Sequence, residues 1–351
     1  MEIQENVALA PYTTLRVGGL ARFFIETRSD QEILEAYRFA REQGAGFFVL
    51  GGGSNLLVSD DGFPGVVVHI GDGEVRAEED GHGRLRVVAD AGLEWDTVVR
   101  LAVERNAAGI ECLAGIPGSV GGTPVQNVGA YGQEVSGTIT RVHAVDLSAE
   151  QVLEMSNEDC WFSYRKSVFN GRRKGRYAIT RVEYSLPLDQ PANVQYRDVK
   201  QYFAERGVER PTLAETADAV RIIRSRKGMV LAEDDPDSRS AGSFFKNPVV
   251  PVETIAVLAR VARCAVDKVP QYPAGGGGVV KTSAAWLIEL AGFRKGFAVG
   301  RAALSTKHVL AITNRGGATA AEIVALRDSV IAGVVKRTGI RLEQEPVLVG
   351  F

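Results

Sequence analysis

The chain has 351 residues, of which 45% are hydrophobic and 24% are charged, and its formal net charge is -2. This length exceeds one ordinary core, so we expect two or three domains. The composition is that of a soluble globular protein, and the charge argues against a nucleic-acid binder, which normally carries a basic surplus.

The N-terminus is polar and acidic, and no segment is apolar for long enough to cross a bilayer. We therefore expect no signal peptide, no membrane partner and a cytoplasmic location. Three scattered cysteines, Cys112, Cys160 and Cys264, are too few for a disulfide framework or a zinc site, and the four histidines show no ligand spacing. The sequence predicts no metal.

The first half of the chain predicts a mixture of helices and strands. Ser29 and Glu32 form a capping box that opens a helix running to about Gln43. Apolar runs on either side of this helix predict strands at 47–50 and 66–70, which together make a small α/β unit. Further strands are expected at 85–89, 141–146 and 177–185, around a helix from about 96 to 105. This irregular order indicates an α+β fold rather than a doubly wound sheet.

The second half continues the α+β pattern. A second capping box, Thr212 with Glu215, starts a helix that ends near Lys227. The basic run at 172–176 is expected to be a solvated turn, and the polar stretch 233–237 a connecting loop outside the core. Helices are predicted near 252–265, 283–291 and 319–338, with a strand at 309–313.

A first glycine segment, Gly51-Gly52-Gly53-Ser54-Asn55, follows an apolar strand. Glycine lets main-chain N–H groups approach phosphate oxygens, and a strand end is where such loops bind pyrophosphate. A tight turn between two strands is an equally good explanation of three glycines alone. The chain contains no Gly-x-Gly-x-x-Gly and no Gly-Lys pair, which disfavours a nicotinamide-binding fold and excludes a P-loop.

A second glycine segment runs from Gly115 to Gly122 and continues through Asn127 to Gly132. So many glycines cost backbone entropy that a merely structural loop would rarely incur. We interpret this segment as a second ligand loop.

A third unusual stretch, Gly242-Ser243-Phe244-Phe245-Lys246-Asn247, places a hydroxyl between a glycine and two aromatic rings. That hydroxyl can donate or accept a proton, and the lysine and amide beside it suit an anionic ligand. The alternative, a turn serine before a strand, is disfavoured because the stretch occurs together with the two glycine segments.

These stretches, together with Ser163-Tyr164-Arg165, Thr14 to Gly19 and the terminal Leu342-Glu343-Gln344-Glu345-Pro346-Val347, resemble the UDP-N-acetylenolpyruvoylglucosamine reductases. Those flavoenzymes make UDP-N-acetylmuramate for bacterial peptidoglycan. The resemblance runs from Tyr12 to the C-terminus with the motifs in the family's order. The Tyr196 segment is similar to the branch that closes a tyrosine-bearing loop over its substrate.

The resemblance implies an α+β fold of the vanillyl-alcohol-oxidase type (PCMH type): a two-part FAD-binding domain and a C-terminal α+β substrate-binding domain. The implied boundaries are 1–70 for FAD subdomain 1, rejoined by 339–351, then 71–228 for FAD subdomain 2 and 229–338 for the substrate domain.

The implied reaction is the NADPH-dependent, FAD-mediated reduction of UDP-N-acetylglucosamine enolpyruvate, with FAD held non-covalently and the enzyme acting as a monomer. In it Ser243 is the proton donor and Arg165 stabilises the substrate carboxylate with its planar fork. Glu345 is the matching C-terminal acid, preferred over the nearby Glu343. The implied FAD contacts are Gly51, Gly52, Gly53, Ser54, Asn55, Gly115, Gly118, Ser119, Gly122 and Asn127. The implied substrate contacts are Tyr196, Arg224, Lys227, Asn247 and Lys281.

Two other functions remain open from the sequence. An FAD-dependent oxidase or dehydrogenase of the same fold, acting on another sugar or hydroxy acid, is disfavoured because neither glycine loop offers a histidine for covalent flavin attachment. A non-catalytic nucleotide-sugar binder is disfavoured by the joint presence of Ser243, Arg165 and Glu345.

Overall fold

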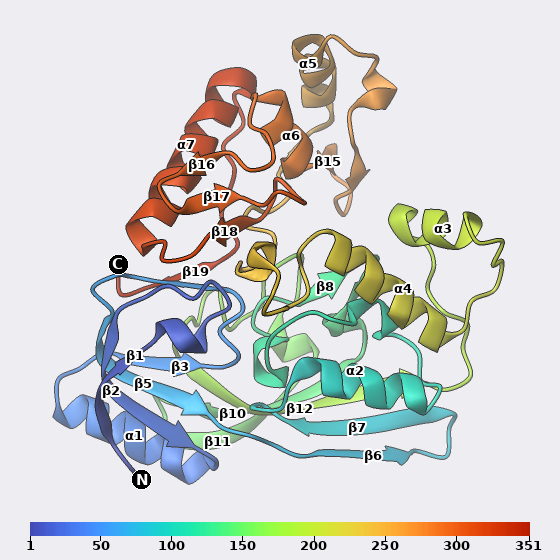
Figure 1. The fold of residues 1–351 in the computed structure, drawn as a ribbon. Coiled ribbons are helices and arrows are strands. Elements are labelled where there is room, and N and C mark those ends of the chain that lie inside the picture. The colour runs from blue at the N-terminus through green and yellow to red at the C-terminus, as the bar shows by residue number, and fades with distance from the viewer. The chain divides into compact units, whose positions relative to one another are not determined.

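The computed structural model describes residues 1–351 and divides into two compact units, whose elements are labelled in Figure 1. Unit 1 consists of Met1–Ala8, Leu20–Gly53 and Gly62–Arg226. Unit 2 consists of Leu9–Gly19, Ser54–Asp61 and Lys227–Phe351. In neither unit does a helix have the length and apolar character needed to span a membrane.

Unit 1 holds a four-stranded sheet, a five-stranded sheet, the two-stranded β8-β9 pair and four α-helices. Its strands are β1 (Gln4–Ala8), β2 (Leu20–Thr27), β3 (Phe47–Leu50), β5 (Phe63–Ile70), β6 (Val75–Glu79), β7 (Arg84–Asp90), β8 (Gly129–Ala130), β9 (Gln133–Glu134), β10 (Ile139–Asp146), β11 (Gln151–Ser156) and β12 (Tyr177–Pro187). Its helices are α1 (Asp30–Glu42), α2 (Trp95–Glu104), α3 (Arg197–Ala204) and α4 (Leu213–Arg226).

The first sheet of unit 1 has the strand order β1-β2-β5-β3, with β2, β5 and β3 parallel. Helix α1 packs on it, and Ile25, Ile33 and Val66 form part of their shared core. The Ser29 hydroxyl accepts the Glu32 N–H at 3.2 Å, as the capping box predicts. The Glu32 carboxylate, however, accepts from the Arg28 N–H at 2.6 Å, one residue before the expected partner. The predicted small α/β unit is therefore present.

The second sheet of unit 1 is antiparallel, with the order β11-β10-β12-β7-β6. Alternate residues of its strands point to opposite faces. On the inner face, Val87, Val182 and Tyr184 are buried in a core that includes Trp95 of α2. Helix α2 contacts β7 on that face (Figure 1).

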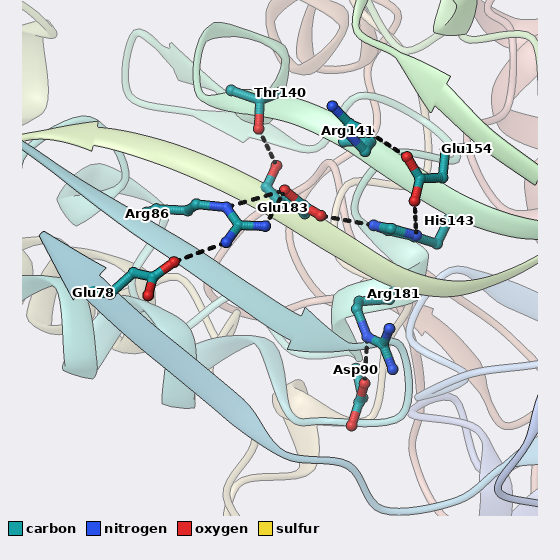
Figure 2. Close-up of polar contacts among 9 residues, drawn as sticks. All are labelled: Glu78, Arg86, Asp90, Thr140, Arg141, His143, Glu154, Arg181 and Glu183. Atoms are coloured by element: carbon teal, nitrogen blue, oxygen red, sulfur yellow. Dashed lines mark hydrogen bonds and ion pairs between the residues drawn. The ribbon is translucent and has the colours of Figure 1, made fainter. Parts of the chain in front are cut away.

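The outer face of this sheet carries a ladder of charged pairs, shown in Figure 2. Glu183, which is 8% exposed, lies at its centre. Its carboxylate accepts from Arg86 Nη2 at 3.0 Å and lies 2.8 Å from His143 Nε2. Burial alone would raise the pKa of Glu183, but the hydrogen bonds from His143 and Arg86 outweigh it and hold that pKa below its ordinary value. The ladder thus supplies hydrogen-bond partners to the nearly buried Glu183 carboxylate.

Unit 2 is built from short strands and three helices. Its strands are β4 (Leu56–Val58), β13 (Val249–Pro251), β14 (Tyr272–Pro273), β15 (Val279–Lys281), β16 (Ala298–Val299), β17 (Ala302–Leu304), β18 (Ile312–Asn314) and β19 (Val347–Val349). Its helices are α5 (Val252–Ala262), α6 (Ala284–Leu290) and α7 (Ala320–Thr338). Strand β19 pairs in parallel with β4, so the C-terminus returns to a segment from the first sixth of the chain.

The ends of α7 show why local sequence predicts it well. The Thr319 hydroxyl accepts the Glu322 N–H at 3.1 Å, and the Glu322 carboxylate accepts the Thr319 N–H at 2.9 Å, completing a capping box. Asp60 accepts the next two N–H groups, which suits the positive end of the helix dipole. Gly339, at φ 75°, ends the helix in the left-handed region that favours glycine.

Two sequence predictions in unit 2 are wrong in detail. The strand expected at 309–313 is instead β18 (Ile312–Asn314), because the chain turns at His308 and Ala311 before the strand begins. The polar stretch 233–237 is a loop as predicted, but it is not outside the core. Asp237 has a side chain only 4% exposed, and its carboxylate is bound by Arg315 and Thr306 at 2.9 and 2.5 Å.

The unit boundaries differ from the implied domain boundaries. Residues 9–19, 54–61 and 339–351 all fall in unit 2. The division of the flavin part at residue 70 remains a proposal: the core around α1 also takes in Val145, Leu147 and Ala178 from beyond that boundary.

Candidate active site

The two glycine segments meet in unit 1. Gly51 to Gly53 follow β3, and a Cβ built on Gly52 would lie 2.7 Å from the Cα of Gly118 and 2.9 Å from its carbonyl carbon. The Ser119 hydroxyl accepts the Gly52 N–H at 3.2 Å, and a Cβ on Gly51 would lie 2.5 Å from that hydroxyl. The loops therefore touch main chain to main chain, which only glycine allows.

This arrangement fits a cofactor that carries a pyrophosphate. Gly53, Gly115 and Gly118 have φ of 60°, 69° and 127°, where side chains are strained. Because Ser119 contributes the one side chain described in this contact, the remaining glycine main chain is able to bring N–H groups close to phosphate oxygens. Gly122 differs, because a Cβ there would meet nothing within 4 Å. The fold thus explains the glycines at 51 and 52 but makes no packing demand at 122.

The second glycine loop is anchored by charged side chains of α2 and α4. Asp96 accepts the Gly115 N–H at 2.8 Å, and Arg224 Nε donates to the Gly115 carbonyl at 3.2 Å. Arg224, a predicted substrate contact, is 8% exposed, and burial lowers the pKa of its guanidinium below the ordinary value. The structure therefore brings Arg224 to the proposed cofactor loop.

A tyrosine pair lies near Arg224. Tyr131 and Tyr196 make an edge-to-face contact with ring centroids 5.2 Å apart. Tyr131 is 8% exposed and burial raises its pKa to about 12, while the Arg224 charge opposes that rise. Tyr196 is half-exposed, as expected of a substrate-facing residue. Sequence reasoning did not select Tyr131, although its place inside a glycine loop was the available signal.

Arg165 occupies a tight turn in unit 1. Ser163 and Lys166 exchange two main-chain hydrogen bonds of 3.0 Å across the turn. Arg165 itself has φ 56°, a conformation that costs a non-glycine residue about 1–2 kcal/mol. Its Nη2 donates to the Gly129 carbonyl at 2.7 Å. A strained backbone at a residue with a proposed catalytic role is consistent with function.

Asn127, a predicted cofactor contact, makes three side-chain hydrogen bonds within the protein. It is 1% exposed, and its Nδ2 donates to Glu134 Oε2 at 2.8 Å and to the Ser163 carbonyl at 3.2 Å. Its Oδ1 accepts the Ser136 N–H at 3.1 Å. Both amide hydrogens are therefore used within the protein, so the side chain has no donor for a cofactor.

Unit 2 pairs the main-chain segments that carry Ser243 and Glu345. The Glu345 N–H donates to the Phe244 carbonyl at 2.9 Å, and the Lys246 N–H donates to the Glu343 carbonyl at 2.9 Å. These bonds form a short antiparallel pairing centred on Phe245 and Gln344. Ser243 is half-buried and follows Gly242, whose φ of 68° turns the chain into this pairing. The sequence separates the two residues by about a hundred positions, and the fold pairs the segments that carry them.

Glu343 occupies a different environment from Glu345. Its carboxylate lies 2.6 Å from Lys246 Nζ and its side chain is 67% exposed. This is a surface ion pair, the kind that contributes little to stability. The arrangement supports the preference for Glu345.

Thr14 braces the same region of unit 2, which gives a role to the N-terminal motif. Its hydroxyl lies 2.6 Å from the Ser240 carbonyl and 3.4 Å from that of Ser54. Asn55 accepts the Val347 N–H at 2.9 Å through its carbonyl, and its side chain donates to the Glu345 carbonyl at 3.4 Å. Ser54 and Asn55 are therefore grouped in unit 2 with Glu345, whereas the three glycines that precede them are grouped in unit 1.

The remaining predicted substrate residues also belong to unit 2. Asn247 Oδ1 accepts the Ala284 N–H at 2.9 Å and so caps α6. Lys281 ends β15, and the Thr282 N–H that follows it donates to the Pro248 carbonyl at 3.0 Å. Asn247 and Lys281 are thus close, and both lie on elements next to the Ser243 segment. Lys227 is half-buried at the start of the unit's main segment.

Comparison with known proteins agrees with both halves of this geometry. Residues 21–156 match the family described as FAD binding domain, and residues 234–349 match the C-terminal domain of UDP-N-acetylenolpyruvoylglucosamine reductase. Proteins named UDP-N-acetylenolpyruvoylglucosamine reductase from Thermobifida fusca and Streptomyces coelicolor are each 45% identical, over 98% of this chain and 97% and 90% of theirs. The crystal structure of the Thermus caldophilus reductase covers 99% of both chains, with a TM-score of 0.64 and 26% identity.

The glycine loops and the first of these matches define a protein with an FAD-binding domain. The predicted fold class, an FAD-binding domain followed by a C-terminal α+β domain, is confirmed. With relatives this similar over almost its full length, the chain belongs to the UDP-N-acetylenolpyruvoylglucosamine reductase family.

Proposed function

We propose that this chain catalyses the NADPH-dependent reduction of UDP-N-acetylenolpyruvoylglucosamine to UDP-N-acetylmuramate, a precursor of peptidoglycan, with FAD as its bound cofactor. Family membership supports the reaction class. The observation that supports the proposal is the main-chain pairing of the segments that carry Ser243 and Glu345, because these segments come from distant parts of the sequence.

The groups that would hold the FAD pyrophosphate are main-chain N–H groups of the two glycine loops other than those of Gly52 and Gly115, which donate to Ser119 and Asp96. When bound, FAD supplies hydride-transfer chemistry, which the protein side chains lack. The loop contact at Gly52 and Gly118 keeps side chains out of this position.

The substrate's enolpyruvyl group develops negative charge next to its carboxylate during reduction. Arg165 carries a permanent charge and a planar fork that binds a carboxylate through two parallel hydrogen bonds. Ser243 is the proposed donor of the proton that completes the product, and positioning matters more here than matched acidity, because a carbanion is a strong base. Glu345, on the segment paired with that of Ser243, is the proposed second acid.

The substrate's diphosphate and sugar require cationic and amide groups. Arg224, Lys227 and Lys281 are the proposed cations. Asn247 uses Oδ1 to cap α6, which leaves its Nδ2 as the group for a ligand. Tyr196, half-exposed beside Tyr131, is the proposed aromatic contact from the tyrosine-bearing loop. The cytoplasmic location and monomeric state remain predictions.

The test is NADPH oxidation by the purified protein with and without UDP-N-acetylenolpyruvoylglucosamine, followed at 340 nm with oxygen consumption measured in parallel. The proposal expects NADPH loss that depends on this substrate, no matching oxygen uptake, and a product two mass units heavier than the substrate. Oxygen consumption that depends on another sugar, and not on UDP-N-acetylenolpyruvoylglucosamine, would favour an oxidase of the same fold instead.

A further inference from the structure

The Arg165 side chain contacts a small hairpin through a hydrogen bond to the Gly129 carbonyl. Strands β8 (Gly129–Ala130) and β9 (Gln133–Glu134) pair so that Gly129 lies opposite Glu134. Tyr131 and Gly132 connect them with φ of 50° and 87°, the two positive values of a tight hairpin turn. The Gly129 carbonyl on this hairpin accepts the hydrogen bond from Arg165 Nη2.

Glycine at 129 has three close neighbours. A Cβ there would lie 2.6 Å from Glu134 Cγ, 2.8 Å from the Gln133 carbonyl oxygen and 3.3 Å from Arg165 Nη1. The Glu134 stem therefore crosses the face of Gly129, and the guanidinium approaches the same residue closely. A side chain at 129 would push on both.

Asn127 connects this hairpin to the backbone of the Arg165 turn. One hydrogen of its Nδ2 goes to Glu134 and the other to the Ser163 carbonyl, which begins the turn. The far side of the turn is held by Asn170, whose Nδ2 donates to the Arg165 carbonyl at 3.1 Å. Because Arg165 has a strained φ, the turn persists only if its surroundings determine it.

We infer that Glu134, Asn127 and Gly129 are positioning residues for Arg165: Glu134 orients Asn127, Asn127 fixes the start of the turn, and Gly129 holds the guanidinium. This inference rests on the proposed function, since it gives these residues a purpose only if Arg165 binds the substrate carboxylate. It reassigns the Asn127 side chain from cofactor contact to the support of Arg165. It also gives a role to Glu134, which no motif selected.

The test is a double-mutant cycle on the full-length, FAD-loaded protein. Gly129→Ala and Glu134→Ala are made in the wild-type and Arg165→Ala backgrounds, with Glu134→Gln as the conservative variant. Gly137→Ala is the matched control, because a Cβ at this nearby exposed glycine meets nothing within 4 Å and its φ is not positive. Flavin absorbance follows reduction by NADPH and reoxidation by the enolpyruvyl substrate in separate anaerobic experiments.

We expect Gly129→Ala and Glu134→Ala to slow reoxidation by about ten-fold or more, the scale of a misplaced catalytic group, while reduction by NADPH stays within about two-fold. In the Arg165→Ala background the same changes should cost less than about two-fold, since the group they position is gone. Glu134→Gln, which keeps an acceptor for Asn127, should recover most of the rate. Gly137→Ala should leave both rates unchanged.

The inference is overturned if the losses are equal in the two backgrounds, if both half-reactions slow together, or if no loss appears in the wild-type background. Where Gly129→Ala does not fold, the two Glu134 variants decide by the same criteria. Full reoxidation by Arg165→Ala alone would instead contradict the proposed role of Arg165, which is a separate result.

Discussion

Replacing Gly52 with alanine tests the main-chain contact between the two glycine loops. Gly52 does not have a positive φ, so alanine can adopt its backbone conformation and only the added methyl group matters. That methyl carbon would lie 2.7, 2.9 and 2.9 Å from the Gly118 Cα, the Gly118 carbonyl carbon and the Ser119 nitrogen. All three are backbone atoms, so the loops must separate by about half an ångström or more, and overpacking of this kind costs about 1–3 kcal/mol.

The variant should show two measurable effects. A loss of about 2 kcal/mol should lower the thermal midpoint by about 4–8 °C, as expected for a unit of this size. Binding of FAD should weaken by at least about ten-fold, or 1.4 kcal/mol, because the N–H groups of both loops are displaced together. The assay is titration of the apoprotein with FAD, followed by flavin fluorescence, alongside thermal unfolding without the cofactor.

Gly122→Ala is the matched control within the second loop. A Cβ at 122 meets nothing within 4 Å, so the stability of the apoprotein should not change. If Gly122 contacts FAD as the sequence predicts, this variant loses FAD affinity without losing stability. A Gly52→Ala protein with normal stability and normal FAD affinity would refute the argument that the close contact of these loops forms the cofactor site.

Three other changes test separate parts of the structure. Arg165→Lys should slow substrate-dependent turnover by roughly a hundred-fold (about 3 kcal/mol), because a point charge cannot reproduce the fork; near-normal steady-state turnover would remove Arg165 from the mechanism. The hydrogen bonds from the Arg176 guanidinium lower the pKa of buried Asp146 to about 2, from its ordinary 3.8. The ionised carboxylate should therefore add about 2 kcal/mol to the free energy of unfolding. This contribution is complete above about pH 4 and is lost as the pH falls toward 2. Asp146→Asn should therefore be less stable than wild type to urea near pH 7, with a smaller gap near pH 3, and an equal gap at both would contradict this. Thr14→Val should cost about 1–2 kcal/mol in thermal unfolding while Thr14→Ser costs less, and equal losses would show that the hydroxyl is not the brace.

Local chemistry explains what the sequence predicted well. Helices α1 and α4 begin at the predicted caps, and α7 begins where the sequence predicted a helix, because in each a Ser or Thr hydroxyl satisfies an N–H group three residues on. The position of the first glycine loop was also predictable locally, because three glycines directly follow the apolar run that forms β3. Family resemblance, rather than any local pattern, assigned Ser243 and Glu345 to one site, and the structure pairs the main chains of their two segments.

Long-range contacts explain what the sequence could not predict. The burial of Asp237 depends on Arg315, far along the chain, so a polar loop looked solvated. The grouping of residues 9–19 with the C-terminal part depends on contacts such as Asn314 with the Leu15 carbonyl. No sequence motif pointed to Glu134, because its proposed role depends on its contacts with Gly129 across the hairpin and with Asn127, seven residues earlier.

The central claim is that Ser243 donates the proton that completes the product. Anaerobic stopped-flow absorbance of Ser243→Ala measures the two half-reactions in turn. Flavin reduction by NADPH needs no proton from this hydroxyl and should run at the normal rate, whereas reoxidation by the enolpyruvyl substrate should slow by about a hundred- to ten-thousand-fold. Ser243→Cys, whose thiol is more acidic, should recover part of the loss. An alanine variant that slows flavin reduction and leaves reoxidation intact would contradict the assignment.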